Sequence, residues 1–283
     1  MTASKTVLIT GTSSGIGLAA AVAAARAGWE VVATMRDPGK AGHLLAQAGA
    51  VGAAGRIHVE RLDVTDAASI ESAVARVTAA HGGLDAVVNN AGAGVVGTIE
   101  IAGMDPVRAA MEVNYFGVVE VTRAAMPHLR ASKGRLVTVT SVGGVVGQPF
   151  NEAYCAAKFA VEGFMEALTS VAATVGVRVT VVEPGAVASE FVASQRLDVP
   201  ALVAGAGPYG PALQSYIDRA RQSFSNAQTA AEAATTVVDV LESEDPPFRV
   251  QTSEWARGFV GTKLADVDGS AVQAMVAQWV GAR

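Results

Sequence analysis

The chain has 283 residues, of which 51% are hydrophobic, so it can bury the core of one large domain, and we expect a single domain over residues 1–283. Its net charge of −5 argues against nucleic acid as the main partner, because phosphate binding needs a basic face. The single cysteine, Cys155, excludes an internal disulfide and suits a reducing cytoplasm, which is the expected location.

Three kinds of segment or site are not expected. The N-terminal residues MTASKTVLIT contain no basic segment followed by a long apolar run, so we predict no signal peptide. Every long apolar stretch is interrupted by glycine, proline or polar residues, so we predict no membrane span. The histidines show no metal-ligand spacing, so no metal site is predicted. They are His43, His58, His81 and His128.

The first predicted elements are a strand, a glycine loop and a helix. Residues 6–10 are largely β-branched, residues 11–17 read GTSSGIG, and an alanine-rich stretch follows as far as Gly28. This order places backbone N–H groups and a helix N-terminus against a pyrophosphate. A second strand at residues 29–35 completes a βαβ unit, so we predict dinucleotide binding, although the glycine spacing differs from the G-x-G-x-x-G form.

The end of the second strand indicates which dinucleotide binds. A carboxylate there would hold ribose hydroxyls, whereas an arginine would accept a 2′-phosphate. Arg36 follows the strand and favours NADP(H). Asp37 leaves NAD(H) as the alternative, unless it caps the next helix with Pro38 at the first helical position.

The next two strands end in small or polar residues. Residues 57–62 are predicted to be a strand, and Asp63, which follows it, either reaches the adenine or opens a turn. A helix over residues 67–80 and a strand over 84–88 lead to Asn89-Asn90-Ala91-Gly92, where small residues let a cofactor lie close to the backbone. A long helix over residues 105–131 carries Asn114, which either faces solvent or holds a buried polar partner.

The chemistry is predicted at the end of the fifth strand, residues 135–140. Ser141 follows that strand, at the edge where α/β sheets bind ligands. Tyr154 and Lys158 lie four residues apart in a helix-favouring segment, so their side chains share one helix face. An ammonium ~4 Å from a phenol would favour phenolate by roughly three pKa units at an effective dielectric of ~20. The alternative is an ordinary aromatic residue beside a solvated amine.

The remaining chain continues the alternation. We predict a sixth strand at residues 177–183, ended by Pro184-Gly185, then an irregular substrate lid at about 189–226. A helix over residues 228–241, a last strand over 248–251 and a helical tail over 253–283 complete the chain. The whole pattern predicts an α/β fold, a Rossmann-type doubly wound parallel sheet of about seven strands with helices on both faces.

Several motifs together resemble those of the short-chain dehydrogenase/reductase family, in family order over roughly residues 5 to 250. The resemblance implies an oxidoreductase in which Tyr154 is the acid or base, Lys158 lowers its pKa, Ser141 holds the substrate oxygen and Asn114 holds a water that links Lys158 to solvent. The matching segments are Thr10 to Gly17, Asp63-Val64, Asn89 to Gly92, Asn114, Ser141, Tyr154 to Lys158 and Pro184 to Ser189. The cofactor-binding residues that it implies are Gly11, Ser13, Ser14, Gly15, Ile16, Gly17, Arg36, Asp63, Val64, Asn90, Ala91, Gly92, Tyr154, Lys158, Pro184, Gly185, Val187 and Ser189.

Two segments, residues 33–37 and 141–154, are similar to the branch that contains 17-beta-hydroxysteroid dehydrogenase type 1 and retinol dehydrogenases. That resemblance implies NADP(H), a reaction between a ketone or aldehyde and an alcohol, and a homodimer or homotetramer. Apolar residues near Ser141 suggest a steroid-like or lipid-like substrate. They are Val142, Val145, Val146, Pro149 and Phe150.

Two alternatives remain open. A 3-oxoacyl thioester reductase would need a basic rim for its carrier's phosphate, and the lid offers only Arg196, Arg219 and Arg221. A nucleotide-sensing protein without turnover would be free to lose the proton-transfer residues, all of which are present.

Overall fold

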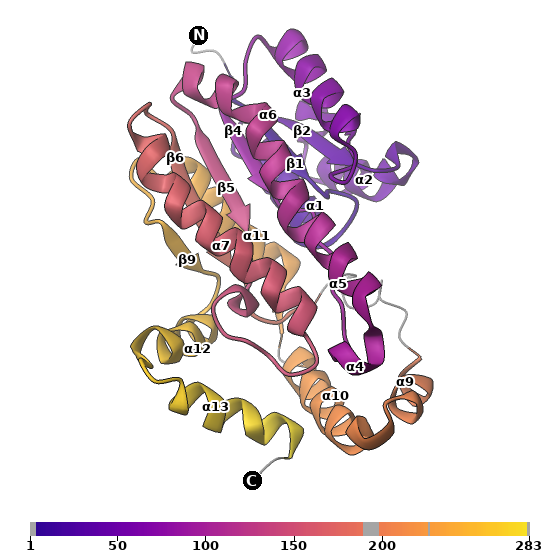
Figure 1. Cartoon of the computed structure of the whole chain (residues 1–283). Helices are drawn as coiled ribbons and strands as arrows, with labels where there is room; N and C mark the ends of the chain where they lie inside the picture. Colours follow the sequence, from indigo (N-terminus) through magenta and orange to yellow (C-terminus); the bar gives the residue numbers. More distant parts are fainter. Residues whose placement is uncertain (1–3, 189–197, 226, 282–283) are drawn as a thin grey trace.

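A computed structural model of the chain describes residues 4–188, 198–225 and 227–281 (Figure 1). The described residues form a seven-stranded parallel sheet with the order β3-β2-β1-β4-β5-β6-β9, and a separate two-stranded sheet pairs β7 with β8. The predicted α/β fold with about seven parallel strands is therefore confirmed. The strands are β1 (Thr6–Thr10), β2 (Glu30–Met35), β3 (Ile57–Arg61), β4 (Ala86–Asn89), β5 (Arg135–Val139), β6 (Arg178–Glu183), β7 (Val187–Ala188), β8 (Gln228–Thr229) and β9 (Arg249–Gln251).

Helices cover both faces of the large sheet (Figure 1). The α-helices are α1 (Gly15–Arg26), α2 (Gly42–Ala50), α3 (Ala67–His81), α4 (Ile99–Ala102), α5 (Met104–Met111), α6 (Gly117–Ser132), α7 (Glu152–Ala173), α9 (Val199–Gly205), α10 (Gly210–Ser225), α11 (Ala230–Glu242), α12 (Glu254–Ala265) and α13 (Ser270–Ala277). Short helical turns are η1 (Pro38–Ala41), η2 (Ala54–Arg56), η3 (Glu112–Phe116), η4 (Val142–Gly144), η5 (Gly207–Tyr209) and η6 (Gln278–Val280).

Alternate residues of β1 pack against the two opposite faces of the sheet. Val7 and Ile9 pack in a core with α1, α2 and α11, whereas Leu8 packs in a second core with α3, α6 and α7. Successive side chains of a strand point to opposite faces, so a fully buried strand must be apolar on both. The continuous apolar runs of the sequence therefore become the central strands of the sheet.

The strand order fixes the place of the site. β2 pairs with one side of β1, and β3 pairs with the outer side of β2. The next strand, β4, pairs with the other side of β1. Parallel sheets of this kind bind ligands outside the carboxyl ends of the strands, at the point where the order reverses. The carboxyl ends of β1 and β4 carry Gly11 and Asn90, both predicted to bind the cofactor.

The long helix predicted over residues 105–131 is interrupted. It forms α5, a π-helical turn at η3 and then α6, and Asn114 lies in the π turn. Single π turns within α-helices occur frequently at functional sites. The interruption therefore marks Asn114 as more than a helix-surface residue.

The prediction that residues 189–226 are irregular was wrong for the part that the structure describes. α9 begins beside Pro200 with Asp198 as its cap, and α10 begins at Gly210-Pro211. Proline suits the first turn of a helix, where its missing N–H would have no partner, so these prolines start helices and do not break them. Residues 189–197, including Ser189, lie outside the described residues.

The tail packs beneath the carboxyl ends of the strands, beside α10 (Figure 1). Phe259, Val272, Val276 and Trp279 form a small core with Val142 and its neighbours in the loop after β5. This packing brings residues 256–279 next to the predicted site. No described helix is both long enough and apolar enough to cross a membrane.

Candidate active site

The glycine loop between β1 and α1 is shaped by close packing against the end of β4. Gly11 has a positive φ of +72°, and a Cβ there would lie 2.8 Å from the Cα of Ala91. A Cβ at Gly17 would overlap both the Gly11 carbonyl oxygen and Nδ2 of Asn90. These positions require glycine because backbone and side chain leave no room for another atom.

Asn90 ties the ends of β1 and β4 together. Its Nδ2 donates hydrogen bonds to the carbonyl oxygens of Thr10 at 2.9 Å and Gly11 at 3.1 Å. The backbone N–H groups of Asn90 and Ala91 donate to Oγ1 of Thr10 at 2.9 and 3.0 Å. The loop is thus held in one conformation, with the N-terminus of α1 facing the cavity, as a pyrophosphate site requires.

At the end of β2, Arg36 and Lys40 line the cavity. The carboxylate of Asp37 instead accepts a hydrogen bond from the N–H of Gly39 at 3.0 Å and caps η1. Asp63 lies on the same wall, where hydrogen bonds from Thr65 and the charge of Arg36 outweigh partial burial and lower its pKa. The cationic side chains at this corner of the cavity fit a phosphate group.

The predicted catalytic side chains come from the end of β5 and the first turns of α7. Oγ of Ser141 accepts a hydrogen bond from the N–H of Gly143 at 2.9 Å, and Ser141 also shares a hydrogen bond with Tyr154. Nζ of Lys158 donates to the carbonyl oxygen of Val139 at 3.1 Å and lies 5.9 Å from the centre of the Tyr154 ring. Ser141, Tyr154 and Lys158 all line the same cavity.

The expected lowering of the Tyr154 pKa was wrong for this structure. Burial raises the pKa of Tyr154 to about 12, against a smaller lowering by the Ser141 hydrogen bond. Burial likewise lowers the pKa of Lys158 to about 8, opposed by the charge of Glu162. The sequence shows that Lys158 and Tyr154 share one helix face, but it does not show that the hydroxyl and the amine are both buried. Burial disfavours the phenolate and the ammonium alike.

Asn114 lies beneath this wall and is fully buried. Its Oδ1 accepts a hydrogen bond from the N–H of Ala93 at 3.2 Å, and its Nδ2 donates to the carbonyl oxygens of Ala93 at 2.9 Å and Ala110 at 3.0 Å. A Cβ at Gly92 would lie 3.0 Å from Oδ1 of Asn114 and 3.7 Å from Nζ of Lys158. Asn114 therefore does not face solvent but holds buried polar partners, which was the second of the two expectations.

The segment after β6 closes the site on the side of the tail. The carbonyl oxygen of Pro184 accepts a hydrogen bond from the N–H of Val142 at 3.0 Å. A Cβ at Gly185 would lie 3.1 Å from the ring of Trp255. The loop that follows β6 therefore touches both the Ser141 loop and the tail.

One cavity of about 1040 Å³ connects these groups. It is lined by every predicted site residue except Gly17 and Asn114, which support its wall from behind, and Ser189, which is not among the described residues. Sequence reasoning missed several residues that line it, among them Lys40, Gln148, Asn151, Tyr216, Trp255 and Trp279. Only Lys40 carried a usable signal, as a second cation close to Arg36.

Comparison with known proteins identifies relatives along nearly the whole chain. The family model described as short chain dehydrogenase matches residues 5–200. Retinol dehydrogenase 8 of Bos taurus is 38% identical over 279 residues, which cover 95% of this chain and 88% of the relative. The 17-beta-hydroxysteroid dehydrogenase type 1 of Homo sapiens is 36% identical over 272 residues, which cover 93% of this chain and 82% of the relative.

Solved structures agree with this similarity. A short-chain dehydrogenase from Streptomyces avermitilis superimposes with a TM-score of 0.77 at 30% identity and covers 99% of this chain and 97% of its own. A short-chain dehydrogenase/reductase from Burkholderia phymatum in complex with NAD gives a TM-score of 0.77 at 25% identity, covering 94% of this chain and 95% of its own. A Burkholderia cenocepacia protein in complex with NADP has the same fold, with a TM-score of 0.73 at 23% identity and coverage of 96% and 97%.

Proposed function

The chain belongs to the short-chain dehydrogenase family, an oxidoreductase family that uses nicotinamide cofactors, and on that premise we propose its specific activity. We propose that it interconverts a ketone and a secondary alcohol, or an aldehyde and an alcohol, on an apolar substrate with NADP(H). One observation carries the proposal: Ser141, Tyr154 and Lys158 line the same cavity as the glycine loop. A carbonyl bound at these three side chains would face a nicotinamide whose pyrophosphate lies on that loop.

The protein's part in the reaction is proton transfer and orientation. The bound nicotinamide would supply hydride to the carbonyl carbon or accept it from the alcohol carbon. Tyr154 donates its phenolic proton to the carbonyl oxygen in reduction and takes it back in oxidation. Ser141 holds the same oxygen through a hydrogen bond, so developing negative charge meets two hydroxyl groups already in place.

Lys158 and Asn114 support the proton transfer. In this proposal the Lys158 ammonium, 5.9 Å from the centre of the Tyr154 ring, supplies positive charge on the side of the cavity where the phenolate forms. It also reaches the ribose next to the nicotinamide, as the family resemblance implies. Asn114 fixes the backbone at Ala93, and in this proposal it holds a water through which Lys158 exchanges protons with solvent.

Two cations support NADP(H) over NAD(H). Arg36 and Lys40 line the cavity where the 2′-phosphate would lie, and each can pair with it. Asp37 is the residue that would favour NAD(H), but its carboxylate caps η1 through Gly39. We propose that Asp63, which lines the cavity next to Val64, contacts the adenine.

The far side of the cavity supports an apolar, ring-containing or long-chain substrate. Its walls include Ile217 and Phe224 from α10 and Trp255 and Trp279 from the tail. The relatives are named for retinol and a hydroxysteroid, both largely apolar. In this proposal α9 and α10 form the substrate lid, and the tail forms its opposite wall.

The alternative of a 3-oxoacyl thioester reductase receives less support. Of the lid arginines, Arg219 and Arg221 line the cavity. The Arg219 guanidinium lies 4.7 Å from the ring centre of Trp279, and Arg221 pairs with Asp218 at 3.6 Å. Both of these cations thus have a partner within the protein, and Arg196 lies outside the described residues.

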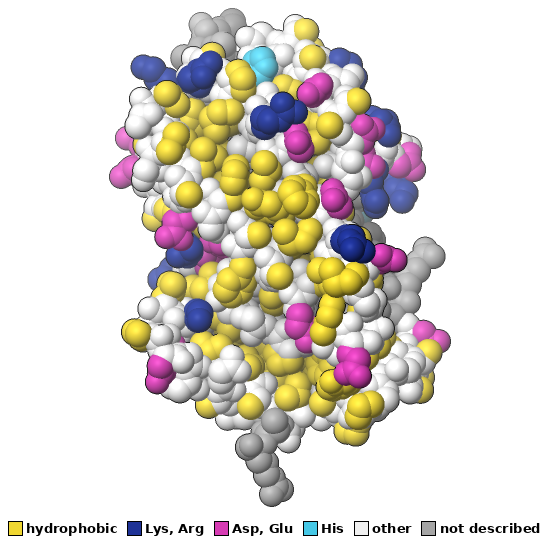
Figure 2. Space-filling model, viewed as in Figure 1, with side chains coloured by type: hydrophobic (Ala, Val, Ile, Leu, Met, Phe, Trp, Pro, Cys, Tyr) yellow, Lys and Arg dark blue, Asp and Glu magenta, His cyan; other side chains and the backbone are white. Residues whose placement is uncertain are grey.

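A homodimer or homotetramer is part of the proposal. Figure 2 shows hydrophobic side chains gathered in the middle of the face that α6 and α7 form. Phe116, just before α6, and Phe159 on α7 are 47% and 40% exposed. Large exposed apolar patches commonly mark contacts between proteins, and sedimentation velocity of the purified chain tests this one.

A substrate screen tests the activity. Ketosteroids, retinoids, 3-oxoacyl thioesters and small ketones would each be assayed with NADPH and NADH through absorbance at the nicotinamide band. The proposal predicts turnover of a ketosteroid or retinoid with NADPH. Turnover of thioesters alone would support the alternative, and no turnover of any carbonyl would contradict both.

A further inference from the structure

The face of α7 that carries Tyr154 and Lys158 continues one turn further to Glu162, a carboxylate that is only 4% exposed. Residues four apart on a helix lie above one another. Lys158 reaches the carbonyl of Val139, and Glu162 hydrogen-bonds with Thr140, the next residue along β5's carboxyl end. Glu162 therefore belongs to the same interface between α7 and β5 that positions the proposed proton-transfer groups.

The same interface is closed by Gly144 in η4. A Cβ there would lie 2.9 Å from Cγ of Glu162 and 3.1 Å from the carbonyl oxygen of Lys158. The loop that carries Ser141 is thus pressed against both residues. Glu162 has little freedom to turn away from this position.

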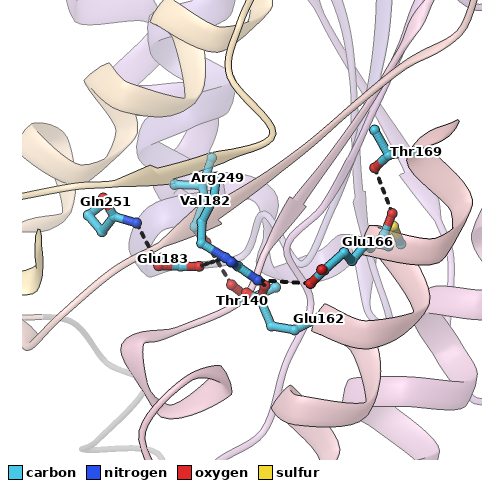
Figure 3. Close-up of polar contacts among 9 residues, drawn as sticks. Thr140, Glu162, Glu166, Thr169, Val182, Glu183, Arg249 and Gln251 are labelled. Atoms are coloured by element: carbon cyan, nitrogen blue, oxygen red, sulfur yellow. Dashed lines mark hydrogen bonds and ion pairs between the residues drawn. The ribbon is translucent and has the colours of Figure 1, made fainter. Parts of the chain in front are cut away.

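Arg249 at the start of β9 holds the Glu162 carboxylate in place (Figure 3). Its Nη2 lies 3.2 Å from Oε2 of Glu162 and 3.3 Å from Oε2 of Glu166, and its Nε lies 2.6 Å from Oε1 of Glu183. Glu183 is fully buried at the end of β6, where Nε2 of Gln251 donates to its Oε2 at 2.8 Å. The Arg249 guanidinium therefore contacts two buried carboxylates, Glu162 and Glu183, and one exposed carboxylate, Glu166.

Arg249 contacts two buried carboxylates, and Lys158 is the other cation that lies close to this region. With Glu162 and Glu183 both ionised, the buried groups carry two negative charges, and Arg249 supplies one positive charge. The Lys158 ammonium supplies the second. Buried charges are costly unless they are paired, so removing one member changes the ionisation of the others.

We propose that Glu162 is a positioning residue for the reaction, whose carboxylate, anchored by Arg249, keeps the Lys158 amine charged where it lines the cavity. This inference rests on the proposed role of Lys158 in proton transfer. Glu183 on β6 also contacts Arg249, so it influences the charge of Lys158 through Arg249 and Glu162.

The directions of the pKa shifts agree with this arrangement. Burial lowers the pKa of Lys158 to about 8, and the Glu162 charge raises it. Burial raises the pKa of Glu162, against Thr140, Arg249 and Lys158, which lower it. The groups that act on Glu162 are thus Lys158 on α7, Thr140 after β5, Glu183 on β6 and Arg249 on β9, and Glu166 on α7 shares Arg249 with it.

The test is a direct titration of Lys158 that needs no substrate. The chain has five lysines, Lys5, Lys40, Lys133, Lys158 and Lys263, so ¹³Cε-lysine labelling gives a simple NMR spectrum in which a Lys158→Met variant assigns the Lys158 signal. Glu162→Gln should lower the Lys158 pKa by about one unit, because it removes the buried opposite charge that raises this pKa. Glu166→Gln is the matched control: it also loses a contact with Arg249, but its side chain is 64% exposed, and the Lys158 pKa should stay as in the wild type.

Two results would overturn the inference. One is an unchanged Lys158 titration in Glu162→Gln, and the other is an equal shift in Glu166→Gln. If Glu162→Gln fails to fold, the reciprocal experiment decides: ¹³Cδ-glutamate titration of Lys158→Met should show a higher Glu162 pKa than the wild type, and an unchanged value overturns the inference.

Kinetics then separate this inference from the proposed function. In Glu162→Gln the alkaline limb of the pH profile of kcat/KM for carbonyl reduction should move to lower pH by the same shift as the Lys158 titration, whereas a merely structural defect would lower the rate at every pH. Absence of turnover by the wild-type protein would contradict the proposed function. The NMR titration would still decide whether Glu162 sets the charge of Lys158.

Discussion

Asn90 occupies the space that a side chain at position 17 would need. Its Nδ2 bridges the carbonyl oxygens of Thr10 and Gly11, and a Cβ at Gly17 would overlap that nitrogen. The cofactor loop and the end of β4 are therefore fitted to each other through a glycine that does not itself line the cavity.

Gly17→Ala should accordingly displace Asn90 and the loop. Overpacking of this kind costs about 1–3 kcal/mol, so we expect NADPH to bind about ten- to a hundredfold more weakly. Fluorescence titration with NADPH measures the change. Gly49→Ala in α2, where nothing lies within 4 Å of the added Cβ, is the control and should bind as the wild type does. Wild-type affinity in Gly17→Ala would mean that the loop adapts to the added methyl group.

Arg36 and Lys40 should discriminate between the two nicotinamide cofactors. Each charge-assisted hydrogen bond to the 2′-phosphate is worth about 1.5–3 kcal/mol, so Arg36→Ala should weaken NADPH binding by about tenfold or more and leave NADH nearly unchanged. Lys40→Ala should act in the same direction. Dissociation constants for both cofactors, with Arg26→Ala at the exposed end of α1 as the control, measure this. Equal losses for NADPH and NADH would reverse the cofactor preference.

Glu183 should make the stability of the fold depend on pH. Burial is the first cause that raises its pKa to about 7, from an ordinary value of 4.5, so the folded state holds a proton that the unfolded state has released. Its contribution to stability is therefore fully present below pH 4.5 and is lost as pH rises towards 7. The shift corresponds to at most about 3 kcal/mol.

Urea unfolding at mildly acidic and mildly alkaline pH measures the effect of Glu183. The wild type should lose free energy of unfolding over this interval, and Glu183→Gln should lose less, because it has no proton to release. A pH dependence of unfolding that is the same in both proteins would contradict the assignment.

Tyr216 should couple the lid helix to the active-site loop. Nδ2 of Asn151 donates a hydrogen bond to its hydroxyl, and its ring lies 5.8 Å from that of Phe150, a residue held at a φ of +59°. Tyr216→Phe removes the hydrogen bond but keeps the ring, so KM for the substrate should rise several-fold, since a hydrogen bond is worth about 1 kcal/mol, while kcat changes little.

Tyr209→Phe is the matched control for Tyr216→Phe. Tyr209 also bonds across the lid, to Glu100 at 2.6 Å, but on the exposed side. Steady-state kinetics of this variant should match the wild type. A KM that rises equally in both variants would show that general loosening of the lid, and not the contact with Asn151, governs substrate binding.

The sequence predicted the sheet and most residues of one cavity wall because these parts depend on local patterns. Apolar runs such as residues 84–88 become central strands, and the glycines after β1 allow a close backbone approach that no other residue permits. Tyr154 and Lys158 could be paired because helical spacing alone puts them on one face. The sequence also indicated that Asp37 could cap the following helix, because an aspartate before a proline suits a helix start, and Asp37 caps η1.

The parts that the sequence did not predict depend on tertiary packing. Pro200 and Pro211 suggested an irregular chain, but each lies where a helix begins. Trp255 and Trp279 reach the cavity only because the tail folds back under the sheet. The direction of the Tyr154 pKa shift depends on burial, which spacing along a helix does not reveal.

Tyr154 is proposed to transfer the proton, and Tyr154→Phe removes the hydroxyl that would do so. The measurement is the NADPH-dependent reduction rate of the best substrate in the screen, alongside NADPH affinity of the same preparation. The account predicts that affinity changes little while kcat falls by at least about a hundredfold, because general acid catalysis is worth that much or more. A rate within a few-fold of the wild type, with NADPH still bound, would contradict it.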